Sequence, residues 1–260
     1  MKKLLVAMLF LPLGMLAQQS GFEITGTITG LPENSRVTLV NLNKAGDTVA
    51  QSVVNKGTFV LKGTVEEPNL FQLALDGVSK KAVLFIGNDN ATVKGSTENV
   101  QQLEVKGSAT HSDFMEMQTI FNPMMQKLMD LNRRIQSTPG ISREDSVFTA
   151  YKTQYDQVIG AIDRFVKDKR SSPLSAFLLV ITRELEQDFV TLEKRFNSLD
   201  ANVQKGFYGK IIAKDIADSK IGAVGTQAIE FTQNDTTGKP VSLASFRGKY
   251  VLVDFWASWC

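Results

Sequence analysis

The first third of the chain alternates apolar and polar residues, a pattern typical of β-strands with one buried face. Turn signals such as Asn55-Lys56-Gly57 and Glu67-Pro68-Asn69 separate the alternating runs. The runs cover residues 22–28, 36–40, 58–62, 71–75, 82–86, 91–94 and 103–105. Seven or eight short strands at this spacing predict an antiparallel β-sandwich or barrel over 18–107.

The pattern changes to a helical period near Ser108, which is a candidate helix N-cap. Pro123 should kink or split the first helix, because proline removes a backbone hydrogen bond. Apolar residues recur at three- and four-residue steps over 147–166, and Pro173 can begin another helix. Shorter helices are expected at 192–199 and 203–217. These segments predict a helical region over 108–219.

Strand signals return over 220–260. Residues 230–233 and 240–243 flank a turn at 234–239. Tyr250–Trp256 is a nearly continuous apolar run, which is typical of a strand buried on both faces of a parallel sheet. The three regions together predict an α+β chain whose last part is the start of a third domain.

Residues 1–17 have the order of a secretory signal peptide: a basic start at Lys2 and Lys3, an apolar run, and a small residue at Ala17. We expect export to the periplasm or cell envelope. The apolar run is too short for an ordinary membrane span of roughly 20 residues. Membrane association is therefore expected only if this segment stays uncleaved, which is the alternative interpretation.

Composition and charge exclude several functions. The chain is 43% hydrophobic and 22% charged, as in soluble globular proteins. Without Lys2 and Lys3 it carries 27 basic and 27 acidic side chains, so no basic surface predicts a nucleic-acid partner. His111 is the only histidine, and no Gly-rich phosphate loop or zinc spacing occurs, so we expect no metal and no cofactor. We expect Glu66 and Glu67 to be solvated charges.

The chemistry of the chain centres on Cys260, its one cysteine. In an exported protein a lone cysteine is either a reactive thiol or half of a pair, whereas a buried inert thiol is the alternative. Asp254 lies within the apolar run, where burial should raise its pKa and suit it to proton transfer; a charge at a strand end is the alternative. Trp256 and Trp259 could exclude water and dock a partner's polypeptide, or pack in the core.

The residues around Cys260 resemble the active-site entry of thioredoxin-like proteins, where a buried strand precedes Trp-Cys-x-x-Cys. Residues 231–250 resemble the lead-in of the exported TlpA/ResA-like branch, although residues 228–231 replace its common Ala-Pro-Asp-Phe. The resemblance implies that Cys260 is the attacking thiol, that a second cysteine lies three positions beyond it, and that Asp254 accepts the second thiol's proton. We therefore expect this chain to be a fragment that stops at the first active-site cysteine.

The N-terminal half, by its short strands and the order of its parts, resembles a β-domain of unknown function that precedes thioredoxin-like domains in exported Bacteroidetes proteins. This resemblance implies no activity.

The sequence thus predicts an exported thiol–disulfide oxidoreductase of the protein disulfide reductase type, acting on protein disulfides or dithiols. The expected catalytic residues are Cys260 and Asp254, and the expected substrate-binding residues are Trp256 and Trp259. One alternative is a redoxin-type thiol peroxidase, which would have Pro and Thr before its cysteine. The other is a non-enzymatic envelope binding module. We expect the 260-residue chain to be inactive alone.

Overall fold

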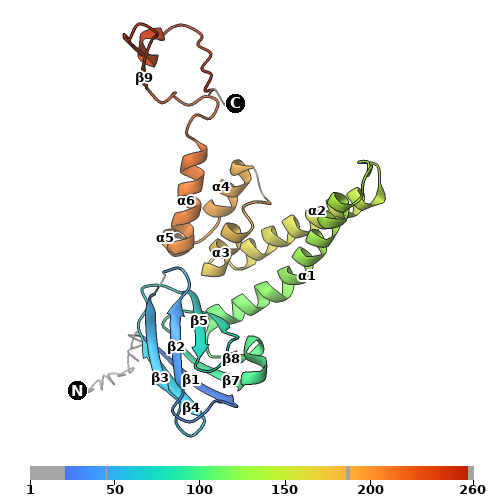
Figure 1. The fold of residues 1–260 in the computed structure, drawn as a ribbon, viewed down its shortest axis with the longest axis vertical. Helices are drawn as coiled ribbons and strands as arrows, with labels where there is room; N and C mark the ends of the chain where they lie inside the picture. The colour runs from blue at the N-terminus through green and yellow to red at the C-terminus, as the bar shows by residue number, and fades with distance from the viewer. Residues whose placement is uncertain (1–20, 45, 186–187, 257–260) are drawn as a thin grey trace, which may run out of the picture.

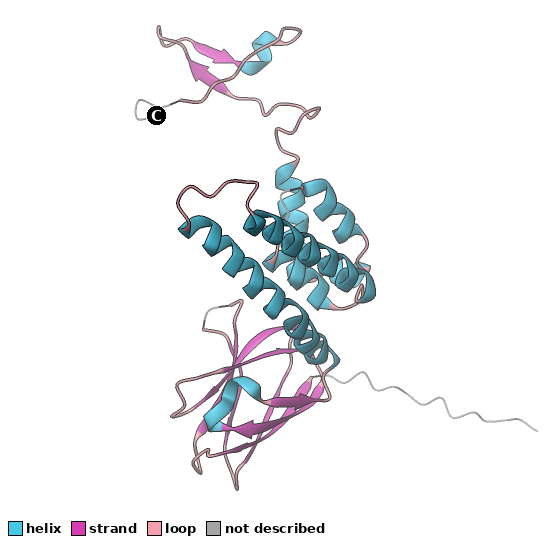
Figure 2. Cartoon of the chain, turned by 90° about the vertical axis from the view of Figure 1, so that its right-hand side faces the viewer, coloured by secondary structure: helices cyan, strands magenta, loops and turns pink. Residues whose placement is uncertain are grey.

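The computed structural model describes residues 21–44, 46–185 and 188–256. A β-sandwich, a group of helices and a small β-hairpin unit follow one another along the long axis of the molecule (Figure 1; Figure 2). This arrangement confirms the predicted α+β class.

The sandwich consists of two four-stranded sheets. One sheet has the strand order β4-β1-β7-β8 and the other has the order β3-β2-β5-β6. The strands are β1 (Phe22–Thr29), β2 (Arg36–Asn41), β3 (Thr48–Val53), β4 (Thr58–Gly63), β5 (Asn69–Leu75), β6 (Ala82–Ile86), β7 (Asn90–Ser96) and β8 (Glu104–Lys106). A 3-10 helix at Thr97–Gln102 joins β7 to β8.

One strand pair departs from the antiparallel pattern. β1 and β7 run parallel, with Glu23 opposite Asn90 and Thr29 opposite Ser96. Parallel neighbours need a long crossover connection, and the strands between β1 and β7 supply it. The interior is formed by residues that alternate along the strands, including the fully buried Ile24, Leu39, Leu61 and Leu73.

Six helices follow the sandwich among the described residues. They are α1 (Ala109–Ser137), α2 (Ser146–Asp168), α3 (Pro173–Ile181), α4 (Phe189–Asn197), α5 (Ala201–Lys205) and α6 (Phe207–Ser219). The Ser108 hydroxyl accepts a hydrogen bond from the backbone N–H of His111, which confirms the predicted N-cap. Of the kink or split expected at Pro123, the split was wrong, because α1 is one helix over Ala109–Ser137. Pro123 lies on the exposed side of α1, while Phe121 and Leu128 on the inner face remain packed in the helical core.

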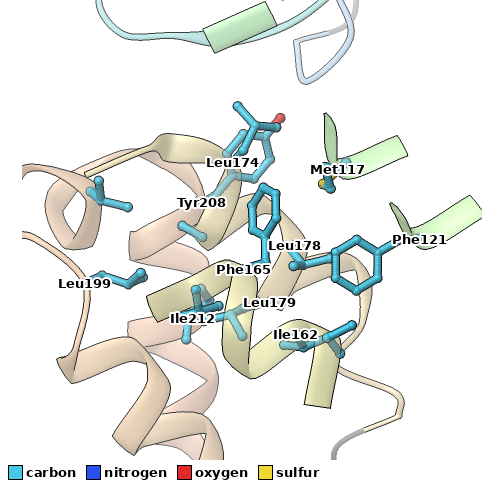
Figure 3. Close-up of a cluster of buried hydrophobic side chains, with 14 of the residues drawn as sticks. Met117, Phe121, Ile162, Phe165, Leu174, Leu178, Leu179, Leu199, Tyr208 and Ile212 are labelled. Carbon is cyan, nitrogen blue, oxygen red and sulfur yellow. The ribbon is translucent and has the colours of Figure 1, made fainter. Parts of the chain in front are cut away.

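The helices enclose their own apolar core (Figure 3). Phe121 and Phe165 meet with ring centroids 5.9 Å apart, joining α1 to α2. Leu174 and Leu178 of α3 are fully buried beside them. The amphipathic periods of the sequence therefore face one shared interior, as their spacing predicts.

Phe85 of β6 belongs to the helical core although its strand belongs to the sandwich. Its ring lies 6.1 Å from that of Phe114, 5.8 Å from that of Phe177 and 6.0 Å from that of Tyr208, measured between centroids. These rings come from α1, α3 and α6. A single side chain of the sheet thus connects three helices to the sandwich.

The first turn of α1 covers the open edge of β6. The backbone N–H of Phe85 donates to Nδ1 of His111 at 3.3 Å, and the hydroxyl of Thr110 donates to the Phe85 carbonyl at 3.3 Å. An edge strand otherwise presents unpaired backbone groups. His111 is only 3% exposed, and this burial lowers its pKa to about 4. The ring is therefore neutral at pH 7, as an accepting Nδ1 requires.

The C-terminal unit contains the hairpin β9 (Thr232–Asn234) and β10 (Pro240–Ser242), followed by a 3-10 turn at Leu243–Phe246. These elements confirm the hairpin expected over 230–243. The Asp235 carboxylate accepts hydrogen bonds from the hydroxyl and N–H of Thr237 and from the N–H of Lys239, which hold its pKa below the usual value.

Residues 250–256 form no strand, so the buried strand predicted there is not observed. Their side chains are exposed, and Trp256 is 75% exposed. An isolated extended segment has no partner for its backbone groups, and no described strand lies beside this one to supply them. None of the helices in the described ranges is long and apolar enough to cross a membrane.

Candidate functional site

The structure places two of the four predicted site residues. Asp254 and Trp256 lie in the exposed segment 250–256, whereas Trp259 and Cys260 lie outside the described residues. The predicted burial of Asp254 was wrong in this structure, because no neighbouring strand covers its segment. The structure therefore does not show an assembled thiol site.

Within the C-terminal unit, Phe231 contacts both Phe255 and Leu243. The rings of Phe231 and Phe255 lie 6.0 Å apart, and Leu243 N–H donates to the Phe231 carbonyl at 3.0 Å. Arg247 and Glu230 form an exposed ion pair at 2.5 Å. Trp256 precedes Cys260 by four residues in the sequence.

A second candidate site lies where the sandwich meets the helices. Two adjoining cavities, of about 280 Å³ and about 520 Å³, share Glu66, Glu67 and Phe207 in their walls. The smaller cavity is lined by Pro68 and by residues of the helical region, including Pro173 at the start of α3. The larger one opens between the β2–β3 loop and the segment before β5.

The walls of these cavities carry a polar network. The Asn43 amide nitrogen donates to Asn69 Oδ1 at 2.5 Å and to the Tyr208 hydroxyl at 2.6 Å. That hydroxyl donates to Asn69 Oδ1 at 2.9 Å. Burial raises the pKa of Tyr208 to about 12, so the phenol stays protonated and can donate.

Glu67 has a structural role that the sequence analysis missed. One of its carboxylate oxygens accepts from the backbone N–H of Phe207 at 2.7 Å and so satisfies the first turn of α6. The expectation that Glu67 is a solvated charge was wrong, whereas Glu66 is exposed as expected. Spacing could not reveal this contact, because 140 residues separate the two partners.

The described residues contain no group of three His, Cys, Asp or Glu side chains that could hold a metal ion. His111, the one histidine, faces the edge of β6.

Comparison with known families gives one match near each end of the chain. Residues 22–114 match the Domain of unknown function (DUF4369), and residues 224–260 match the AhpC/TSA family. No curated protein shows significant similarity to the chain. The second match supports a thioredoxin-like, redoxin-type segment and thus thiol–disulfide oxidoreductase or peroxidase chemistry in general.

The first match names no activity, but its extent agrees with the packing. It runs to residue 114 and so includes His111 and Phe114 in the first turns of α1. Those two residues contact Phe85, by a hydrogen bond and by ring packing respectively. The start of α1 is thus part of the matched unit and also covers the edge of its sheet.

Proposed function

We propose that the protein is an exported thiol–disulfide oxidoreductase, of the protein disulfide reductase type found in the TlpA/ResA-like branch. The observation that carries the proposal is the match of residues 224–260 to a redoxin family, since this segment contains Cys260. The partners are protein disulfides or dithiols. The sandwich and helices act as a docking or spacing module.

The proposed reaction is thiol–disulfide exchange. The Cys260 thiolate attacks one sulfur of the partner's disulfide, forms a mixed disulfide, and displaces the other sulfur as a thiolate. A second thiolate then attacks Cys260 Sγ, which releases the partner as a dithiol and leaves the protein oxidised. A reducing dithiol returns it to the starting state. We place the second thiol three positions beyond Cys260, outside the 260 residues, which contain one cysteine.

Asp254 and the tryptophans have supporting roles in this proposal. Asp254 accepts the proton of the second thiol, so that it can attack as a thiolate. Trp256 and Trp259 contact the partner's polypeptide next to the disulfide that Cys260 attacks.

We predict that the 260-residue chain reacts once but does not turn over. With 5,5′-dithiobis(2-nitrobenzoate), Cys260 should release thionitrobenzoate in a 1:1 ratio to protein, and Cys260→Ser should release none. Insulin reduction with dithiothreitol as the recycling reductant should not exceed that of Cys260→Ser. A longer chain that includes the second cysteine, three positions beyond Cys260, should reduce insulin with multiple turnovers. Turnover by the 260-residue chain equal to that of the extended chain would contradict the proposal.

The second candidate function is a thiol peroxidase, and the name of the AhpC/TSA family favours it. In that reaction the Cys260 thiolate attacks the peroxide O–O bond, becomes a sulfenic acid, and releases water or an alcohol after proton transfer. Consumption of hydrogen peroxide by the extended chain, without reduction of insulin, would favour this function. Failure of both assays would leave the non-enzymatic envelope binding module.

We also predict export with cleavage near Ala17-Gln18. The basic start, apolar run and small residue motivate this expectation. N-terminal sequencing of the protein from fractionated cells should give an envelope form that lacks residues 1–17. Recovery of intact Met1 in the envelope would instead support an uncleaved anchor, and recovery of intact Met1 in the cytoplasm would contradict export itself.

A further inference from the structure

We propose that the paired cavities at the sandwich–helix junction bind an extended polypeptide segment that carries a basic side chain. This goes beyond the thiol chemistry proposed above, because it assigns a ligand class to a surface far along the chain from Cys260. Four observations carry it: an unused donor in the wall, the sign of the charge, the shape of the two cavities, and the polar network that holds them open.

The unused donor is the amide nitrogen of Asn69. Asn69 lines the larger cavity and is only 7% exposed. Its Oδ1 accepts from the backbone N–H of Leu70 at 2.8 Å, which fixes the orientation of the amide because a backbone nitrogen can only donate. Asn43 and Tyr208 donate to the same oxygen. Within the described residues, the Nδ2 of Asn69 therefore has no acceptor.

This nitrogen belongs to a residue that lines the larger cavity. No buried side-chain nitrogen or oxygen of the described residues lacks a hydrogen-bond partner, so an unpartnered Nδ2 must touch solvent. The cavity that Asn69 lines is where a nearly buried side chain can do so. A ligand that offers a carbonyl oxygen would satisfy this donor, and a polypeptide backbone supplies one at each residue.

The charge of the larger cavity favours a cation. Asp47, Glu66 and Glu67 line it, against one lysine, Lys44. Lys44 lies 3.9 Å from Asp47, and Glu67 accepts from the first turn of α6. Within the described residues, the Glu66 carboxylate has no ion pair or hydrogen bond. A lysine or arginine side chain of a ligand would complement this excess of carboxylates.

The two cavities adjoin, so one extended chain can place side chains in both. They share the wall formed by Glu67 and Phe207, and the smaller cavity presents Pro68, Pro173 and Val203 on its side. In an extended segment, residues i and i+2 lie on the same face, about 6.6 Å apart. An apolar side chain can thus enter the smaller cavity while a basic side chain two residues away enters the acidic one.

The site is also built on rigid elements. Asn69 begins β5, while Phe207 and Tyr208 begin α6. Glu67 accepts a hydrogen bond from the Phe207 N–H, and Asn69 accepts one from the Tyr208 hydroxyl, so these elements are joined. Groups held in place before binding lose little freedom when the ligand arrives. The network therefore explains how two distant parts of the sequence form a fixed binding wall.

The experiment titrates the 260-residue Cys260→Ser chain with acetyl-Leu-Gly-Lys-amide and follows the backbone amides and the Asn69 side-chain NH₂ by NMR. The serine variant separates this test from the thiol chemistry. Shifts should be confined to 41–44, 46–49, 64–71, 171–176 and 202–209 and should include the Asn69 NH₂. Acetyl-Leu-Gly-Glu-amide should bind at least about fivefold more weakly, and added salt should weaken binding of the lysine peptide.

Asp47→Asn with Glu66→Gln should weaken binding of the lysine peptide about fivefold. The control Asp76→Asn with Glu144→Gln changes the net charge equally at exposed positions outside both cavities, and it should leave the affinity unchanged. An unchanged spectrum away from the cavities verifies that each variant is folded. No binding, equal binding of the two peptides, shifts elsewhere, or equal effects of the two double variants would overturn the proposal.

Discussion

Replacing Phe85 with alanine should lower the free energy of unfolding by about 3–5 kcal/mol, the range for truncating a buried phenylalanine. Phe85 is 0% exposed and meets the rings of Phe114, Phe177 and Tyr208. Its removal leaves a cavity between the sheet and three helices. The loss should therefore appear in the signals of both parts, as measured by denaturant unfolding followed by circular dichroism at helix and strand wavelengths.

Val83→Ala is the matched control for Phe85→Ala. Val83 lies two residues earlier on β6 and is 41% exposed, so its truncation leaves no cavity. We expect a loss below about 1 kcal/mol for this variant, as for most surface substitutions. Equal losses for the two variants would contradict the role of Phe85 as the connection between the sandwich and the helices.

Acidification should destabilise the fold through His111. Its pKa is about 4 in the folded protein and about 6.5 when exposed, because burial disfavours the charged ring. The unfolded chain therefore binds the proton more readily, and stability is lost as the pH falls from about 6.5 towards 4. The shift corresponds to a loss of about 3 kcal/mol from this residue, complete only below about pH 4.

The measurement compares the free energy of unfolding at pH 7, 5.5 and 4 for the native chain and for His111→Gln, which cannot titrate. Carboxylates contribute to both, so the difference between the two curves isolates the histidine. Because His111 is the only histidine, its ring proton signal also gives the pKa directly by NMR, provided that the protein carries no histidine tag. A ring that titrates near 6.5 would contradict the burial seen in the structure.

Much of the β-region could be predicted from alternation alone, since one buried face imposes a period of two. β3 was not predicted, because Ala50 is its only buried residue and the strand lacks a clear apolar face. The parallel pairing of β1 with β7 was also invisible, because strands more than 60 residues apart leave no local sign of their direction. Most helices were predicted, since their apolar faces and the Ser108 cap are local features. The single helix expected over 203–217 was wrong, because Gly206 divides it into α5 and α6.

Phe85 and His111 show where sequence reasoning stopped. Alternation fails at Leu84-Phe85-Ile86, where three consecutive side chains are buried, and this was the one signal that β6 is covered on both faces. Nothing in the sequence indicated which element covers it. His111 could be recognised only as a residue at a helix start, because the strand edge that it contacts lies 26 residues away.

For the thiol site, too, some features could be predicted from the sequence and others depend on the tertiary structure. The sequence by itself predicted the chemistry, because the aromatic residues, the carboxylate of Asp254 and Cys260 are consecutive or nearly so. It could not determine burial around Asp254, which depends on neighbouring strands that the described residues do not supply. The junction cavities are the opposite case. Glu67, Asn69 and Tyr208 are ordinary residues in the sequence, and only tertiary packing of β5 against α6 brings them together, because contacts across 139 residues have no local period.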